Sequence, residues 1–222
     1  MKAKIDKTML ITTLVCLVPL TLSAFLYGRL PDQVPIHFNL AGEADNYAPK
    51  AFGAFILPLS LALGNVLLQL VLNNDPKRDH GQPLREMSKW IIPILSLFIT
   101  PLTLFKALGS DIRLERVLPV LVALLFLVIG NYLPKCKQNY TVGIKIPWTL
   151  ASEENWNRTH RFAGWVWSIA SLVLLVSALT GLLVSLVLPV TITAMVLLPV
   201  IYSFLFYKRS KGNDTKDSTD TP

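Results

Sequence analysis

The sequence predicts an all-α, polytopic integral membrane protein with about six transmembrane helices and both termini in the cytoplasm. Of its 222 residues, 52% are hydrophobic and 16% are charged, and the mean hydropathy is +0.50. A soluble domain carries about 25% charged residues. Residues 162–207 contain no charged side chain, and 16 of the 21 Lys and Arg lie in alternate polar segments. These three observations indicate helices that cross a bilayer repeatedly.

The first two predicted spans are residues 9–26 and 51–72, separated by a polar segment. A cleaved signal peptide is the alternative for the first run, because the chain begins with basic residues. However, the run is longer than a signal-peptide apolar region, and residues 27–30 are a poor cleavage site. We therefore expect residues 1–72 to form an N-terminal two-span unit, in which Asn65 and Gln69 are the polar residues of the second span.

Four further spans are expected within residues 73–207. The third and fourth are residues 90–105 and 117–133. Residues 162–207 would measure roughly 69 Å as one helix, more than twice a hydrocarbon core of about 30 Å. This run must therefore fold back, and residues 180–185 suit the turn. The polar residues 208–222 are expected to form a disordered tail.

The distribution of basic residues predicts the orientation. With the N-terminus inside, the inner segments hold 16 Lys and Arg and the outer segments hold 5. Cytoplasmic loops carry the excess of basic residues in membrane proteins. Both termini and the loop before the fifth span are therefore expected in the cytoplasm, and the loop between the first two spans outside. The net charge of +7 is explained in this way and indicates no direct nucleic-acid binding.

The polar segment 131–165 holds three of the five Trp residues. Ser152 is a plausible N-cap, and Glu154 precedes Arg158 by four residues in the favourable order. If the segment is helical after Pro147, the four-residue spacing predicts one shared face, made by Trp148, Ser152, Trp156 and His160. The alternative is that the Trp residues only occupy the headgroup belt.

The order of residues in this segment resembles the signature of the SdpI family of bacterial membrane proteins. Lys145-Ile146 departs from the Arg-Thr that the resemblance leads us to expect. The resemblance implies a structural or partner-binding role for the matching positions, which are Asn131, Lys135, Asn139, Gly143, Pro147, Trp148, Thr149, Trp156, Thr159, His160, Arg161 and Gly164.

The loop between the first two spans contains a second pattern. Pro35 favours an extended backbone at the residue before it, and Asn39 and Gly42 suit a turn. The spacing resembles a domain of unknown function that often precedes the SdpI signature. Its matching positions are candidates for peptide binding: Pro35, His37, Phe38, Asn39, Gly42, Asp45, Tyr47 and Lys50.

The sequence gives no sign of an enzyme, a cofactor or a metal site. His37 and Asp45 are the one His–carboxylate pairing to consider, and zinc sites need three or four protein ligands. We expect His37 to pack or hydrogen-bond within its loop. His80 is expected in a solvated loop, and His160 has no nucleophile or paired acid near it in the sequence. The two cysteines, Cys16 and Cys136, form no metal-binding pattern.

The resemblance implies immunity against a secreted antimicrobial peptide. It also implies signalling, in which the membrane protein captures a cytoplasmic autorepressor. The expected partners are the lipid bilayer of the bacterial inner membrane, the peptide toxin and the repressor. The alternative is a multi-pass transporter or channel of unknown substrate. Carriers usually place ionisable residues inside their spans, and the expected spans contain no charged residue between their ends.

Overall fold

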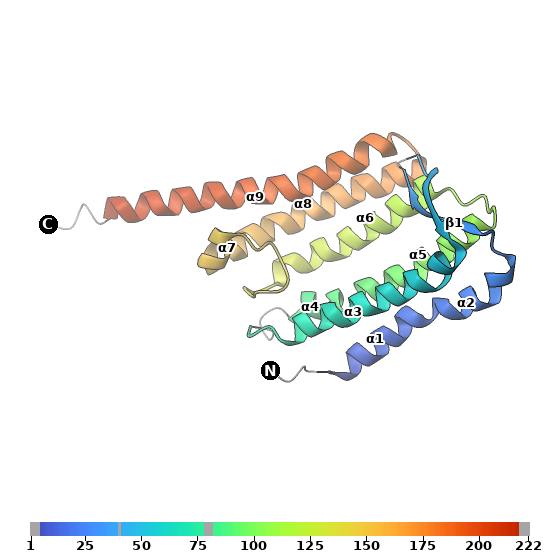
Figure 1. The fold of residues 1–222 in the computed structure, drawn as a ribbon. Helices are drawn as coiled ribbons and strands as arrows, with labels where there is room; N and C mark the ends of the chain where they lie inside the picture. Colours follow the sequence, from blue (N-terminus) through green and yellow to red (C-terminus); the bar gives the residue numbers. More distant parts are fainter. Residues whose placement is uncertain (1–4, 40, 78–81, 218–222) are drawn as a thin grey trace. The chain divides into compact units, whose positions relative to one another are not determined.

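The structure, a computed structural model, describes residues 5–39, 41–77 and 82–217 (Figure 1). His80 lies outside these residues. The longer helices are α3, α5, α6, α8 and α9, and a two-stranded β-hairpin follows α2. The elements are α1 (Lys7–Leu17), α2 (Pro19–Leu26), β1 (Gln33–Phe38), β2 (Ala44–Pro49), α3 (Leu57–Asn73), α4 (Gln82–Ser88), α5 (Ile91–Ala107), α6 (Leu114–Tyr132), α7 (Pro147–Ala151), α8 (Glu153–Thr180) and α9 (Val184–Asp217). A π-helical turn at Phe52–Ile56 leads into α3, and short 3₁₀ turns lie at Tyr27–Arg29 and Leu133–Lys135.

Six helical segments of the described chain are long and apolar enough to cross a membrane. This confirms the all-α, six-span prediction, to which the structure adds the hairpin. The segments are Lys7–Arg29, Phe52–Asn73, Pro83–Ala107, Leu114–Lys135, Glu153–Thr180 and Val184–Lys211.

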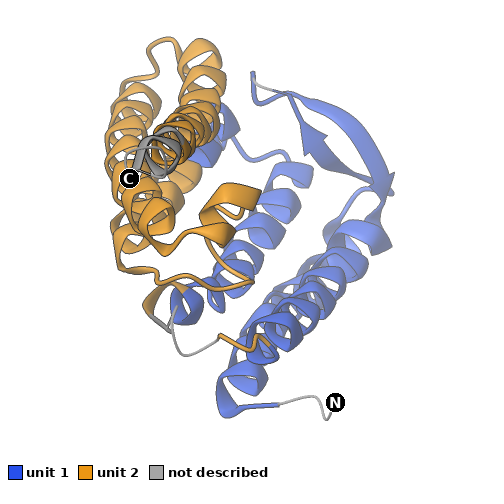
Figure 2. Cartoon of the chain, turned by 90° about the vertical axis from the view of Figure 1, so that its left-hand side faces the viewer, with its two compact units in different colours: residues 1–74, 85–119 blue, residues 75–84, 120–222 orange. Residues whose placement is uncertain are grey.

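Two compact units make up the chain (Figure 2). Unit 1 comprises residues 1–74 and 85–119, and therefore contains the first three spans and the hairpin. Unit 2 comprises residues 75–84 and 120–222, with most of α6 and all of α7, α8 and α9. This division differs from the expected boundary at residues 72 and 73, because the third span packs with the first two. Each unit is described separately.

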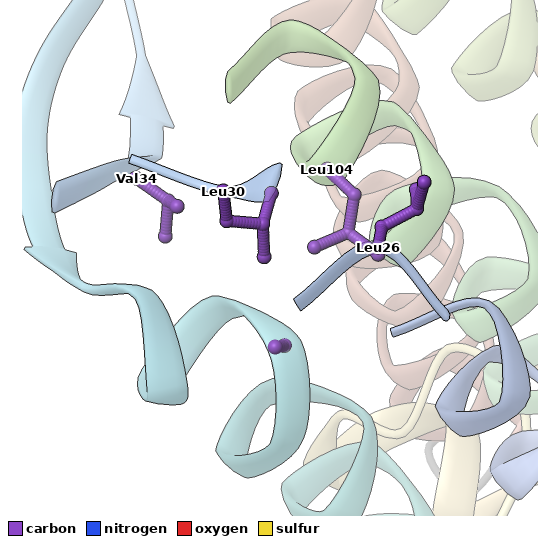
Figure 3. Packing of buried hydrophobic residues seen from close by; sticks show 5 residues of the cluster. Leu26, Leu30, Val34 and Leu104 are labelled. Atoms are coloured by element: carbon purple, nitrogen blue, oxygen red, sulfur yellow. The ribbon is translucent and has the colours of Figure 1, made fainter. Parts of the chain in front are cut away.

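A small apolar cluster in unit 1 supports the hairpin. Val34 of β1 lies with Leu26, near the end of the first span, with Leu30, just after that span, and with Leu104 of α5 (Figure 3). Ala54, at the start of the second span, completes the cluster. Val34, Ala54 and Leu104 are fully buried. The first strand therefore sits directly on the ends of three spans, and the hairpin is an ordered part of unit 1.

A buried polar cluster lies between α1 and α3 in unit 1. Asn65 Nδ2 donates to the hydroxyls of Thr12 (3.2 Å) and Thr13 (2.9 Å), and Gln69 Nε2 donates to Thr12 and to Asn65 Oδ1 (3.2 Å). Thr12, Asn65 and Gln69 are fully buried. Hydrogen bonds between polar side chains hold helices together in a bilayer, where apolar surface gives no drive to associate. The two amides therefore join α3 to α1.

A buried lysine forms ion pairs at the end of unit 1 opposite the hairpin. Lys89 is 2% exposed, and its Nζ lies 2.9 Å from Asp6 Oδ2 and 3.2 Å from Glu86 Oε1. Asp6 also caps α1, since its Oδ1 accepts the Met9 N–H at 2.7 Å. Burial acts to raise the pKa of Asp6, but the Met9 N–H and Lys89 together hold it below its usual value. This pair fixes the start of α1 to the start of α5.

In unit 2, α8 and α9 run antiparallel beside each other (Figure 1). Gly181 ends α8 in a left-handed conformation with φ of 76°, and Leu183 follows with φ of 52°. The predicted turn at residues 180–185 is confirmed. Helix α9 continues to Asp217, so the first ten residues of the segment expected to be disordered are helical, and residues 218–222 lie outside the described chain.

Candidate functional site

The hairpin contains the first group of predicted residues. Strands β1 and β2 pair antiparallel, with Val34 opposite Ala48 and Pro35 opposite Tyr47. Asn39 shapes the tip, because its Oδ1 accepts the N–H groups of Ala41 (2.9 Å) and Glu43 (3.0 Å). The extended backbone and the turn that the sequence predicts are both present.

Gly42 allows the hairpin tip to approach α6. Its φ is 79°, and a Cβ at this position would lie 2.7 Å from the backbone nitrogen of Glu115. A side chain therefore fits neither the backbone conformation nor the space. The tip is held against the first turn of α6, within unit 1.

Two side-chain pairs lie at the hairpin, His37 with Asp45 and Lys50 with Asp32. His37 Nδ1 lies 2.5 Å from Asp45 Oδ1, with the two side chains 67% and 43% exposed. Lys50 Nζ lies 3.2 Å from Asp32 Oδ1 and above the ring of Tyr27. In the described residues no three His, Cys, Asp or Glu side chains gather as a metal site would require. The expected local hydrogen bond of His37 is present.

A pocket of about 580 Å³ lies beside the hairpin in unit 1. Pro35 lines it from β1, while Phe38, near the tip, is half-buried. Tyr47 is 55% exposed at its edge. Charged and polar groups complete the wall: Gln33, Glu43, Lys106 and Glu115. The pocket therefore combines an exposed aromatic ring with groups that can pair with polar parts of a ligand.

Trp156 and His160 are the centre of the second group, in unit 2. Both are fully buried on α8, and their rings stack with centroids 4.0 Å apart. Trp156 Nε1 donates to the carbonyl of Cys136 at 2.7 Å. His160 Nδ1 lies 2.8 Å from the carbonyl of Trp156, so it donates there, and Nε2 accepts the Ile144 N–H at 2.9 Å. Two loop segments are thus bonded to the first turns of α8.

Gly143 fits against these rings. Its φ is 109°, and a Cβ here would lie 2.5 Å from His160 Nε2 and 3.0 Å from the Trp156 ring. Gly164 is similarly confined, because a Cβ would lie 2.6 Å from Pro134. Both glycines of the signature are therefore close-approach positions between the loop and α8.

Asn139 organises the loop itself. Its buried Oδ1 accepts the N–H groups of Thr141 (2.9 Å) and Val142 (2.8 Å), and its Nδ2 donates to the Lys137 carbonyl at 2.9 Å. Asp75 adds a second support, since its Oδ2 accepts from the Thr141 hydroxyl at 2.7 Å. This bond joins residues 75–84, a distant segment of unit 2, to the loop at residues 136–146, which we call the signature loop.

The short helix α7 is capped from both ends. Pro147 occupies its first turn, and the Thr149 hydroxyl accepts the Ile146 N–H at 3.1 Å. Gln138 Nε2 donates to the carbonyls of Thr149 (2.9 Å) and Leu150 (2.8 Å).

A polar network also joins α8 to α9: Asn155 Oδ1 accepts from the hydroxyls of Thr159 (2.9 Å) and Ser203 (2.6 Å).

The predicted single face through Trp148, Ser152, Trp156 and His160 is wrong. Ser152 caps α8 in an extended conformation, with φ of −135° and ψ of 118°, so α7 and α8 are separate helices. Trp148 instead stacks on Tyr207 of α9, with centroids 6.1 Å apart. The predicted cap is confirmed, as Ser152 accepts the Asn155 N–H at 3.2 Å, and so is the Glu154–Arg158 pair, at 2.9 Å.

The remaining signature residues lie on the surface of unit 2. Asn131 and Arg161 are exposed, and Lys135 lies above the ring of Tyr132. The sequence did not single out Asp75, Gln138 or Cys136 as part of this site. Asp75 accepts from the Tyr140 N–H and the Thr141 hydroxyl, and Gln138 donates to backbone carbonyls, so both act through contacts that only the folded loop creates. Cys136 accepts from Trp156 through its backbone carbonyl and from Asn139 through its sulfur, and the lone cysteine formed no pattern in the sequence that pointed to either contact.

Comparison with known proteins places these two groups of residues in recognised regions. Residues 135–203 match the SdpI/YfhL protein family, and residues 14–61 match a domain of unknown function, DUF1648. The chain is similar to Immunity protein SdpI of Bacillus subtilis (strain 168), with 24% identity over 93% of this chain and 99% of that protein. No solved structure matches the chain.

Each matched region contains the centre of one of the two sites. The hairpin lies within the first region, and the loop bonded to Trp156 and His160 lies within the second. The relative aligns with 208 residues of this chain. Residues 135–203 of this multi-pass membrane protein therefore match the SdpI/YfhL protein family, and a match to DUF1648 precedes them.

Proposed function

We propose that this chain is an immunity protein of the bacterial cytoplasmic membrane, which protects the cell against a secreted antimicrobial peptide. The hairpin Gln33–Pro49 is the surface that contacts the peptide. The observation that carries the proposal is the pocket beside the hairpin, where exposed Tyr47 adjoins Pro35 and the carboxylates of Glu43 and Glu115. The name of the related immunity protein supports the same role.

The architecture of the hairpin suits a peptide ligand. A two-stranded sheet has unpaired strand edges, which can add an extended peptide through main-chain hydrogen bonds. Aromatic rings supply much of the binding energy at such surfaces. Because Val34 anchors β1 to the spans, the hairpin offers these groups on a fixed support.

A survival assay tests the proposal. A peptide-sensitive strain expressing this chain, challenged with the peptide encoded with it or with that of the related system, should survive at raised peptide concentrations. Phe38→Ala with Tyr47→Ala should lower the protective concentration by roughly tenfold at unchanged abundance, since aromatic anchors contribute most at interfaces. Phe98→Ala is the control, because Phe98 is also an exposed aromatic residue, at 46%, but does not line the pocket. Full protection by the double variant would contradict the role of the hairpin.

A signalling role is the second part of the proposal. Three spans separate the hairpin from the signature loop, so the two lie on opposite faces if every span crosses. The loop offers exposed Tyr140 and Lys145 for capture of a cytoplasmic repressor, while Lys145 Nζ is positioned by the carbonyls of Tyr140 and Thr141. A bacterial two-hybrid assay with the repressor should lose its signal in Tyr140→Ala/Lys145→Glu. An unchanged signal would contradict this contact.

The interior of unit 1 argues against the transporter alternative. Asn65 and Gln69, the strongest polar groups of the second span, are engaged by Thr12 and Thr13. They therefore act as contacts between helices and do not line an open path. This supports the binding role over transport.

A further inference from the structure

One exposed stripe of α8 changes from charged to apolar along its length. Arg158, Arg161 and Trp165 follow one another at spacings of three and four residues, which places them on the same side of the helix. Trp165 is 70% exposed, and Ile169 continues the stripe at 59%. Tryptophan occupies the boundary between hydrocarbon and headgroups. The two arginines therefore lie at headgroup level, on the side that faces lipid.

Helix α9 also has exposed apolar residues followed by exposed basic residues, but here the basic residues lie toward the C-terminus. Ile201 and Leu205 are exposed at 51% and 50%, and the exposed Lys208 and Arg209 follow them. Because α8 and α9 run antiparallel, the start of one adjoins the end of the other. The Arg158 guanidinium lies 5.0 Å from the centroid of the Phe206 ring, which fixes the level at which they meet. Asn155 of α8 is hydrogen-bonded to Ser203 of α9, so Lys208 and Arg209 lie on the other side of this level from Arg158 and Arg161.

These cations have little compensation from carboxylates. Arg158 pairs with Glu154 at 2.9 Å, but both side chains are more than half exposed, so the pair is weak. Among residues 5–39, 41–77 and 83–211, no carboxylate lies within 4 Å of Arg161, Lys208 or Arg209. Among these described side chains, Arg161 has no carboxylate partner and is exposed to an anion from outside the chain.

We propose that Arg158 and Arg161 form a binding surface for the phosphate group of an anionic phospholipid. Guanidinium groups bind phosphate through paired N–H donors, and basic residues near a membrane surface favour anionic lipids. The apolar stripe below them accepts the acyl chains of the same lipid. This surface is distinct from Tyr140 and Lys145 of the signature loop, and it depends on neither the immunity nor the signalling role.

The test is lipid binding to the purified full chain, measured by native mass spectrometry in detergent. The probes are phosphatidylglycerol and phosphatidylcholine with identical acyl chains. Phosphatidylglycerol should bind roughly tenfold more tightly, and Arg158→Gln/Arg161→Gln should remove most of this preference by weakening phosphatidylglycerol binding more than phosphatidylcholine binding. The matched control is Arg113→Gln/Arg116→Gln, which removes two arginines at the same spacing from the start of α6 and should keep the preference.

Further experiments distinguish lipid binding from binding of other anions. Raising the salt concentration should weaken the preference, because exposed charges are screened, whereas millimolar inorganic phosphate should not displace phosphatidylglycerol. Equal binding of the two lipids, or an equal loss in the control variant, would overturn the proposal. Displacement by inorganic phosphate would instead indicate a site for free anions. Binding of polyglutamate without phosphatidylglycerol would indicate an acidic protein partner, and either result would also overturn it.

Discussion

At the scale of single residues, the contact between Gly143 and His160 supports the signature loop. Gly143→Ala should lower the thermal stability, because the new Cβ would lie 2.5 Å from Nε2 and displace the acceptor of the Ile144 N–H. A strained backbone costs about 1–3 kcal/mol, and a lost buried hydrogen bond costs about 1–3 kcal/mol more. Thermal unfolding of the purified chain in detergent measures the sum.

Gly109 provides the control for backbone strain alone. Its φ is 82°, but nothing lies within 4 Å of the Cβ that alanine would add. Gly109→Ala should therefore lower the free energy of unfolding only by the cost of the strained backbone, about 1–3 kcal/mol. If both variants lost the same stability, the close approach of the loop to His160 would contribute nothing, contrary to the structure.

Cys136 predicts a dependence on alkaline pH. Burial raises the pKa of its thiol from 9.0 to about 11, although the Asn139 amide acts in the opposite direction. Below pH 9 the thiol is neutral in both states. As the pH rises from about 9 to about 11, ionisation favours the unfolded chain, so the folded chain loses stability.

The comparison that isolates this effect is between the parent and Cys136→Ala. The parent should lose thermal stability faster than the variant above pH 9, and the difference between them should be constant below pH 9. A constant difference up to pH 11 would show that the thiol is accessible to solvent in the folded chain.

At the scale of elements, the amide contacts between α1 and α3 determine how the first two spans pack. Asn65→Leu with Gln69→Leu should destabilise the chain by about 1–2 kcal/mol, since interhelical hydrogen bonds in membranes contribute about 0.6–2 kcal/mol. Ser60→Leu on the exposed side of α3 is the control, because the Ser60 hydroxyl bonds only within its own helix. Thermal unfolding in detergent should separate the two. Equal stability would mean that the amides do not join the helices.

The break between α7 and α8 shows where sequence reasoning fails at this scale. Ser152 was correctly predicted as an N-cap, but an N-cap has an extended backbone, which is incompatible with a continuous helix through the same residue. The four-residue spacing from Trp148 to Trp156 therefore could not define one face. The turn at Gly181 was predictable, because the apolar run was too long for one span and contained one suitable glycine.

The hairpin was predicted only in part. The Pro35 and Asn39 signals gave an extended segment and a turn, but the pairing of β1 with β2 depends on packing of Val34 against Leu104, which lies 70 residues away. The pocket likewise depends on Lys106 and Glu115, outside the recognised pattern. Contacts between distant segments carry no local signal in a single sequence.

At the scale of the whole molecule, orientation in the membrane is the basis of the proposed function. The excess of basic residues in alternate segments predicts that the signature loop lies inside and the hairpin outside. With three spans between them, the two sites are expected on opposite faces. A secreted peptide reaches the hairpin only if this orientation holds.

Cysteine labelling tests this claim most directly. Gln33 and Tyr140 are both exposed. The native cysteines are replaced by Cys16→Ala and Cys136→Ala, so that the introduced cysteine is the thiol that reacts. An impermeant maleimide applied to intact cells should label Gln33→Cys at once and Tyr140→Cys only after the cells are permeabilised. Labelling of Tyr140→Cys but not Gln33→Cys in intact cells would invert the topology and contradict contact between the hairpin and a secreted peptide.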